Sequence, residues 1–81
     1  MPVDQTSVFA KIKSIVAEQL GIAQDCIEPN STLEGLGADS LDRFEVIIKI
    51  EEEFSIAIDD DAADKISTLQ QAVECVIKLA K

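Results

Sequence analysis

The sequence predicts an all-α protein: a four-helix bundle with three longer helices, one short helix and a long loop between helices one and two. Apolar residues recur at helical spacing, residues that favour helix starts precede them, and strand signals are weak throughout. The 81 residues make a single domain, 1–81. Its core is small, because a chain of this size buries only about 60 to 65% of its unfolded surface.

The first helix is expected over residues 4–20. Its apolar residues follow helical spacing, polar residues occupy the opposite side, and Gly21 stands where a C-terminal cap belongs. Residues 22–38 then form a long structured loop, since they hold one proline, two glycines and only scattered apolar anchors. Loops of more than about 15 residues are uncommon in compact domains and usually functional. The anchors are Ile22, Ile27, Leu33 and Leu36.

The second helix is expected over residues 40–54, which contain neither Gly nor Pro, with Asp39 or Ser40 as its N-cap. At 100° per residue its apolar side chains form two groups, which together cover more of the circumference than one core-facing stripe. One group comprises Val46, Ile47, Ile50 and Phe54, and the other Leu41, Phe44 and Ile48. We take the second group as surplus to the core. A binding face and packing under the long loop explain it equally well.

The remaining helices follow from capping signals. The acidic segment 59–66 predicts a small third helix with Asp59 or Asp60 as its cap. Residues 67–70 fit a capping box ahead of a fourth helix. The apolar face of that helix consists of Leu69, Val73, Val76, Ile77 and Ala80.

Composition and charge narrow the functional classes. The chain is 47% hydrophobic, too much for a disordered protein, and no apolar run approaches the roughly 20 residues that cross a bilayer. Its first residues lack the basic start and apolar stretch of a secretory signal, so we expect a soluble, cytoplasmic monomer. A net charge of -9 argues against nucleic acid and anionic membranes as partners and favours basic proteins.

The negative charge is confined to one part of the chain. Residues 34–64 hold eleven acids against two bases, Arg43 and Lys49, and therefore carry the whole net charge of -9. A solvated face is the commoner explanation of a charged run, but this degree of segregation favours a docking surface.

The residue types argue against an enzyme. There is no His or Tyr, and no neighbour in sequence activates Cys26 or Cys75, so neither a general base nor an activated nucleophile is evident. Both cysteines are expected to be free thiols. An EF-hand that starts at Asp59 fails, because Asp64 stands where Gly is required and Gln70 where Glu is required.

Ser40 remains as the candidate site. As a plain N-cap, its hydroxyl would accept hydrogen bonds from backbone N–H groups and contribute about 1 kcal/mol. As an attachment point, it would place an esterified phosphate at the positive end of the helix dipole. The residue pattern alone leaves both roles open.

A specific motif surrounds this serine. Residues 36–42 read LGADSLD, Glu45 follows, and residues 50–54 read IEEEF. Together with EQLGI at the end of the first helix and DKIST before the last, these motifs make essentially all 81 residues resemble an acyl carrier protein.

The resemblance implies a prosthetic group. Ser40, between Asp39 and Leu41, would carry a 4'-phosphopantetheine arm that a separate transferase adds from coenzyme A. The thiol of the arm would hold acyl groups as thioesters for fatty-acid synthesis, so the chain itself would need no catalytic residues.

The resemblance also implies a docking face on the second helix. Its partners would be a phosphopantetheinyl transferase, acyltransferases and ketosynthases that present basic patches. Charge steering would make these contacts fast, weak and salt-sensitive. The implied docking residues are Leu41, Asp42, Glu45, Ile48, Glu51 and Glu52. No dedicated metal site is expected, although weak divalent cation binding is predicted at Glu34, Asp39 and Asp42.

Arg43 and Lys49 depart from the family pattern. Arg43 falls within the core-facing arc of the second helix, where a charge cannot be buried unpaired. We therefore expect it to reach past the helix start and pair with an acid of the segment 59–64. Because these bases alter the docking face, a carrier for a polyketide or specialised lipid pathway is one alternative. Another is an acidic interaction or cation-binding domain with no prosthetic group, in which Ser40 acts only as a cap.

Overall fold

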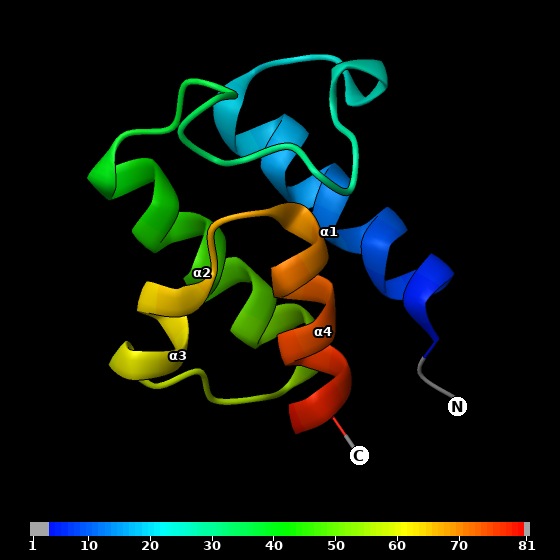
Figure 1. Cartoon of the computed structure of the whole chain (residues 1–81), viewed down its shortest axis with the longest axis vertical. Helices are drawn as coiled ribbons and strands as arrows, with labels where there is room; N and C mark the ends of the chain where they lie inside the picture. The colour runs from blue at the N-terminus through cyan, green and yellow to red at the C-terminus, as the bar shows by residue number, and fades with distance from the viewer. Residues whose placement is uncertain (1–3, 81) are drawn as a thin grey trace.

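The structure is a computed structural model that describes residues 4–80. Within these residues the chain forms α1 (Gln5–Leu20), a short 3₁₀ helix η1 (Gln24–Cys26), α2 (Ser40–Phe54), α3 (Asp60–Lys65) and α4 (Leu69–Leu79) (Figure 1). The described part of the chain contains no strand, only an isolated bridge between Thr32 and Thr68. The predicted four-helix fold is therefore confirmed.

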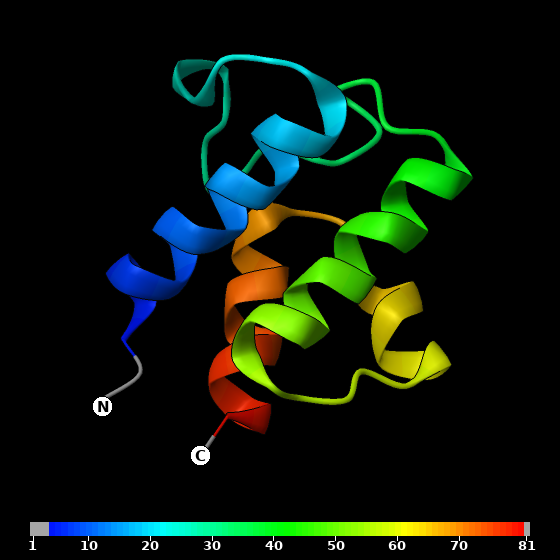
Figure 2. The same cartoon turned by 180° about the vertical axis from the view of Figure 1, so that it is seen from behind.

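The three longer helices enclose an aliphatic core. Helix α1 packs against both α2 and α4. Figures 1 and 2 show α4 on one face of the molecule and α1 and α2 on the other, with α3 on the outer side of α2. The core residues come from all three longer helices and from the connecting segments: Val8, Ile12, Val16, Ala17, Ile27, Leu33, Val46, Ile47, Ile50, Ile58, Ile66, Leu69, Ala72, Val73 and Val76. Helix α3 contributes no buried residue, so its position depends on few contacts.

Gly21 and Asp59 cap their helices as the sequence predicts, whereas Asp4, which the prediction placed inside the first helix, is its N-cap. The Asp4 carboxylate accepts from the backbone N–H of Ser7 at 2.8 Å and starts α1. Gly21 ends the same helix in the left-handed conformation. The Asp59 carboxylate accepts from Ala62 N–H at 2.8 Å and starts α3.

The capping box of α4 lies one residue later than predicted. Thr68, not Ser67, is the N-cap: its hydroxyl accepts from Gln71 N–H at 3.1 Å. The Gln71 side chain in turn accepts from the backbone N–H of Thr68 at 2.9 Å, so Gln70 has no part in the box. The reason is non-local, because Thr68 is held extended by its bridge to Thr32 in the long loop.

The long loop is fastened to the segment that leads into α4. Leu33 N–H donates to the Ser67 carbonyl at 3.2 Å, and Leu69 N–H donates to the Ser31 carbonyl at 3.0 Å. Gln70 N–H donates to the Pro29 carbonyl at 2.8 Å. Of the four predicted apolar anchors, two are buried and two pack partly buried against the core: Ile27 and Leu33, and Ile22 and Leu36, respectively. The loop is thus a fixed structure that brings the chain to the start of α2.

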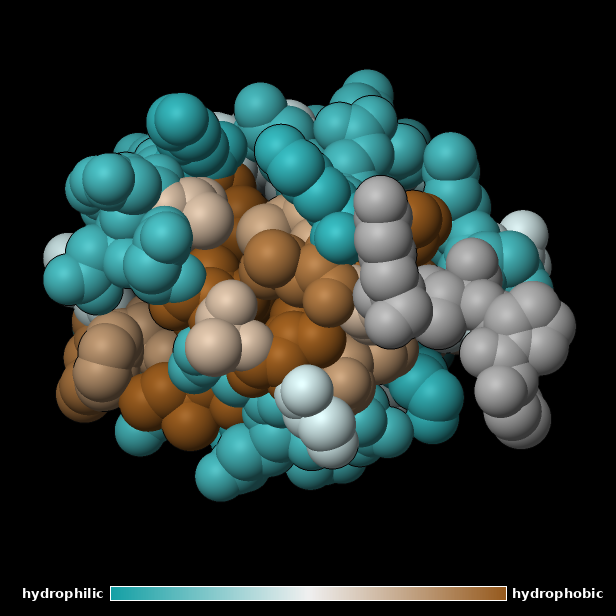
Figure 3. Space-filling model, turned by 90° about the horizontal axis from the view of Figure 1, so that it is seen from below, coloured by the Kyte–Doolittle hydropathy of each residue, from teal (hydrophilic) through white to brown (hydrophobic). Residues whose placement is uncertain are grey.

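The end of the bundle remote from the start of α2 is partly apolar. Figure 3 shows apolar side chains in the middle of this face, with hydrophilic ones around them. Leu79, near the end of α4, is 43% exposed. None of the helices in residues 4–80 has the length and apolar character that a bilayer crossing requires.

Candidate functional site

Ser40 is the first residue of α2, and Asp39 is its cap. The Asp39 carboxylate accepts from Asp42 N–H at 2.8 Å, and the Asp42 carboxylate accepts from Asp39 N–H at 3.4 Å. Ser40 is exposed, and its hydroxyl forms no hydrogen bond with any residue that the structure describes. The alternative in which Ser40 serves as the helix cap is therefore wrong, and its hydroxyl is free for other chemistry.

The turn before α2 sets the position of this hydroxyl. Ala38 N–H donates to the Leu33 carbonyl at 2.9 Å, which folds the chain back on a buried anchor. Gly37 has φ of +97°, a conformation that side chains with a Cβ rarely adopt. At Gly35, an added Cβ would lie 2.7 Å from the hydroxyl oxygen of Thr32, which accepts from Gly35 N–H. The backbone conformation thus favours glycine at position 37, and at position 35 a larger residue would displace the Thr32 hydroxyl that fixes the turn.

A hollow of about 440 Å³ opens beside Ser40. Its lining combines apolar and charged residues and comprises Leu33, Glu34, Ala38, Asp39, Ser40 and Arg43. The hollow gives the Ser40 hydroxyl open space on one side.

Arg43 lines this hollow and links α2 to α3. Its guanidinium donates to the Ala63 carbonyl in the last turn of α3. The prediction that Arg43 pairs with an acid of the segment 59–64 is wrong in its partner, because within residues 4–80 no carboxylate lies within ion-pair distance of it. The acids of α3 are exposed, whereas Ala63 is half-buried and carries a carbonyl at the negative end of the helix.

The two apolar groups of α2 separate for the most part as predicted. Val46, Ile47 and Ile50 are buried in the core and Phe54 packs partly buried against it, whereas Leu41 is 64% exposed and Phe44 is 61% exposed. Ile48 is half-buried. Packing under the long loop therefore does not account for Leu41 and Phe44. Phe44 was absent from the docking residues implied by the resemblance, although its angle on the helix already placed it beside Leu41.

Three of the four implied docking carboxylates also hold the fold together. Asp42 closes the capping box, and Glu45 accepts from the side-chain amide of Gln19 at 2.8 Å, which joins α1 to α2. Glu51 accepts from Ile58 N–H at 2.7 Å and anchors the segment after α2. Glu52 is exposed and has no hydrogen bond with the described residues. The link through Gln19 could not be found from sequence, because it joins residues 26 positions apart.

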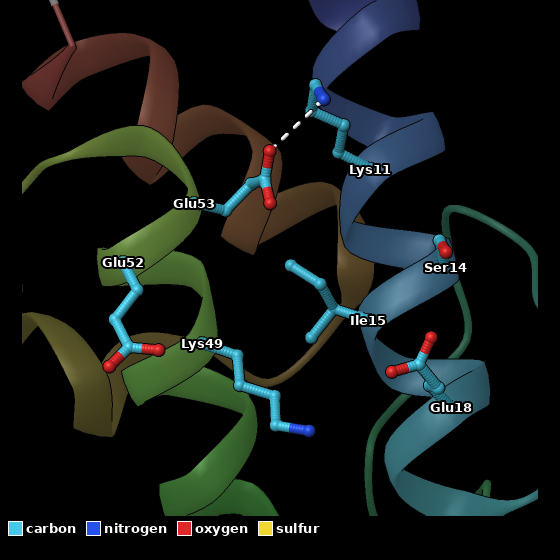
Figure 4. A pocket seen from close by; sticks show the side chains of 7 residues that line it. All are labelled: Lys11, Ser14, Ile15, Glu18, Lys49, Glu52 and Glu53. Atoms are coloured by element: carbon cyan, nitrogen blue, oxygen red, sulfur yellow. Dashed lines mark hydrogen bonds and ion pairs between the residues drawn. The ribbon is translucent and has the colours of Figure 1, made fainter.

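Lys49 lines a groove between α1 and α2 and does not lie beside the exposed Leu41 and Phe44 of the implied docking face. Figure 4 shows its side chain extending from α2 toward α1, while Glu52 points away from α1. An ion pair between Lys11 and Glu53, at 3.1 Å, spans the same groove. The groove holds about 460 Å³ and is lined by Lys11, Ser14, Ile15, Glu18, Lys49, Glu52 and Glu53.

No metal site is evident within residues 4–80, where no three His, Cys, Asp or Glu side chains are placed to hold an ion. Asp39 and Asp42 are engaged with each other in the capping box. Weak divalent binding at Glu34, Asp39 and Asp42 stays a prediction.

Both cysteines are free thiols, as expected. Cys26 is exposed in η1, and Cys75 packs partly buried on α4. Burial raises the pKa of the Cys75 thiol, the Asp59 carboxylate raises it further, and Lys78 opposes them. Because a raised pKa disfavours the thiolate, Cys75 is poorly suited to act as a nucleophile.

Comparison with known proteins identifies the family. A family model described as the phosphopantetheine attachment site matches residues 10–76. The chain is 44% identical over 78 residues to the acyl carrier protein of Cyanidioschyzon merolae (strain NIES-3377 / 10D). This alignment covers 95% of this chain and 86% of that protein. The chain belongs to the acyl carrier protein family. The crystal structure of the acyl carrier protein of Thermotoga maritima, at 2.00 Å resolution, has a TM-score of 0.81 and 28% identity over 93% of this chain and 88% of that one.

Acyl carrier proteins are carriers rather than catalysts, and their cofactor is a covalently attached 4'-phosphopantetheine. The residues around Ser40 fit such a group. The free hydroxyl of Ser40 borders an open hollow, and Arg43, whose positive charge is complementary to a phosphate, lines the same hollow. When bound, this cofactor supplies the thiol that holds the acyl group.

Proposed function

We propose that Ser40 is the attachment residue of the 4'-phosphopantetheine arm and that the chain carries acyl groups for fatty-acid synthesis. The observation that carries the proposal is the division of labour at the start of α2. Asp39 and Asp42 cap the helix, so the neighbouring hydroxyl has no structural task. A serine that only started a helix would itself accept the capping hydrogen bond.

The attachment reaction would be carried out by a phosphopantetheinyl transferase. The Ser40 oxygen forms a bond to the phosphorus of coenzyme A that bears the pantetheine, the bond from that phosphorus to the bridging oxygen breaks, and the nucleotide part leaves. The hydroxyl proton goes to a base of the transferase, since no described residue of this chain accepts it. This chain contributes position and exposure, because its long loop and capped helix hold the hydroxyl in one place.

The docking face for partner enzymes consists of Leu41, Phe44 and Ile48 with the carboxylates beside them. Leu41 and Phe44 are exposed and Ile48 is half-buried, and such apolar side chains next to acids suit a partner that offers an apolar pocket within a basic patch. The partners are the transferase, acyltransferases and ketosynthases. We also propose that the single domain, 1–81, acts in the cytoplasm as a monomer.

Mass spectrometry of the intact protein and of the Ser40 peptide tests the attachment. The chain is incubated with coenzyme A and a phosphopantetheinyl transferase of broad specificity. The expected result is one phosphopantetheine on the Ser40 peptide of the wild type and none on the variant Ser40→Ala. An unmodified wild type under conditions that modify another carrier protein would rule out the proposal.

Loading assays separate the pathways. The modified protein is offered to ketosynthases and acyltransferases of fatty-acid synthesis and, in parallel, to polyketide enzymes. Preferential loading by the polyketide enzymes would retain Ser40 as the attachment residue and replace fatty-acid synthesis with a specialised pathway.

A further inference from the structure

We propose that Arg43 binds the phosphate of the arm on Ser40, an inference that rests on the proposed function of that serine. The two residues are three positions apart on α2, so their side chains are neighbours on the helix surface. Both line the hollow of about 440 Å³, and Arg43 is the one basic residue in that lining. A phosphodiester attached to the Ser40 oxygen would therefore lie in the same hollow as the Arg43 side chain.

The charges around Ser40 create a need for such a cation. A phosphodiester carries a negative charge, and Glu34 and Asp39 line the same hollow. The helix start cannot offer its full set of N–H groups, because the capping box uses those of Asp39 and Asp42. Without a cation, the phosphate would be attached at a site that repels it. Arg43 is placed to offset this repulsion.

The guanidinium is held in place and keeps unused donors. An arginine has five N–H donors, and the hydrogen bond to the Ala63 carbonyl uses one of them. The planar fork of the remaining donors matches phosphate oxygens, and a side chain that is already tethered loses little freedom when it binds. The tether to α3 thus prepares Arg43 for an anion in the hollow.

The position of Arg43 also determines on which side of α2 the phosphate of the arm lies. At 100° per residue, Ser40 lies between Arg43 on one side and Phe44 on the other. A phosphate held by Arg43 lies toward the α3 side of α2, away from the exposed side chains of Leu41 and Phe44. The phosphate is thereby kept apart from the docking face, so that a partner enzyme can contact Leu41 and Phe44 without displacing the phosphate from Arg43.

The test compares the protein before and after attachment of the arm, in the wild type and in the variants Arg43→Gln and Lys49→Gln. Lys49 is the other base of residues 34–64 but lines a different groove, so its variant controls for net charge. Mass spectrometry first verifies that each protein is modified. The equilibrium constant of unfolding is then measured in urea at low salt for both forms of each protein.

Attachment is expected to lower the unfolding constant by about threefold in the wild type and in Lys49→Gln, as for an exposed ion pair. In Arg43→Gln this effect is expected to be lost. The comparison within each variant removes the separate cost of losing the bond to Ala63. In the wild type, the side-chain N–H resonance of Arg43 is expected to shift on attachment, which needs no variant and covers the case that Arg43→Gln does not fold.

The outcomes separate the two proposals. An unmodified Ser40 would reject the attachment itself. A fully modified protein whose unfolding constant changes equally in the wild type and Arg43→Gln, or whose Arg43 resonance stays in place, would overturn the role of Arg43 and leave the attachment intact.

Discussion

The division of labour at the start of α2 can be measured as stability. Replacing Asp39 with Ala in the unmodified protein removes the carboxylate that accepts from Asp42 N–H and breaks the reciprocal capping box. Loss of an N-cap costs about 1 kcal/mol, and loss of a negative charge at a helix start adds about 0.3 to 1 kcal/mol. Asp39→Ala is therefore expected to destabilise the fold by about 1 to 2 kcal/mol.

Ser40→Ala is expected to behave differently. Its hydroxyl has no hydrogen-bond partner among the described residues, and the side chain is exposed. Alanine favours a helix over serine by a few tenths of a kcal/mol, so the free energy of unfolding should change by less than about 0.5 kcal/mol. The two substitutions are adjacent in sequence, yet the structure separates their effects.

Urea and thermal unfolding, followed by circular dichroism, give both values. In a domain of this size a change of 1 kcal/mol in the free energy of unfolding shifts Tm by about 4 to 8 °C, a difference large enough to measure. Asp39→Asn is the matched control, because asparagine is also a good cap and removes chiefly the charge. If Ser40→Ala destabilised the protein as much as Asp39→Ala, the hydroxyl would be a structural cap and the reasoning for attachment would fail.

Three further predictions concern the surface of the carrier. Glu52→Lys should slow attachment of the arm by roughly a factor of 2 to 10 at low salt, since Glu52 is exposed and adds to the field that steers basic partners. Phe44→Ser should weaken binding of a partner enzyme roughly tenfold, as expected for an aromatic contact residue, with little change in Tm because the side chain is 61% exposed. Iodoacetamide should modify exposed Cys26 before Cys75, and the pH midpoint for Cys75 should lie above the ordinary thiol range because burial raises its pKa.

A different result would contradict each of these three predictions. Equal attachment rates for Glu52→Lys and the wild type at low salt would remove Glu52 from the docking face. Unchanged binding of Phe44→Ser by calorimetry would show that the exposed ring is not a contact. Equal alkylation of both thiols across pH would contradict the packing of Cys75.

The raised pKa of Cys75 also makes the stability of the fold depend on pH. Because the folded protein holds the thiol proton more tightly than the unfolded chain does, the contribution of this group to the free energy of unfolding is complete below the unfolded-state pKa and is lost as pH rises through the folded-state pKa.

Local signals explain why much of the fold could be predicted. The ends of α1 and α2 depend on residues within four positions of each boundary, such as Asp4, Gly21 and Asp39. The two apolar groups of α2 follow from its 3.6-residue period, which also placed Phe44 outside the core. The motif around Ser40 is equally local, so the candidate attachment residue could be named before the structure was known.

The two predictions that are wrong, the N-cap of α4 and the partner of Arg43, concern places where segments far apart in sequence meet. The start of α4 depends on the bridge between Thr32 and Thr68, two residues 36 positions apart. The partner of Arg43 depends on which atom of α3 faces α2, and the sequence shows the acids of α3 but not its half-buried carbonyl. Periodicity and capping patterns contain no information on such contacts.

The structural tasks of the docking carboxylates do not remove their electrostatic role. Asp42, Glu45 and Glu51 accept hydrogen bonds from backbone N–H groups or from the amide of Gln19, which are neutral donors. A neutral donor fixes the direction of a carboxylate and leaves its charge in place. The field that attracts a basic partner depends on the summed charge within about a Debye length, roughly 10 Å, and so includes these residues. On the proposed docking face, the fixed carboxylates would therefore steer the encounter, and the exposed side chains of Leu41 and Phe44 would provide the contacts that select the partner.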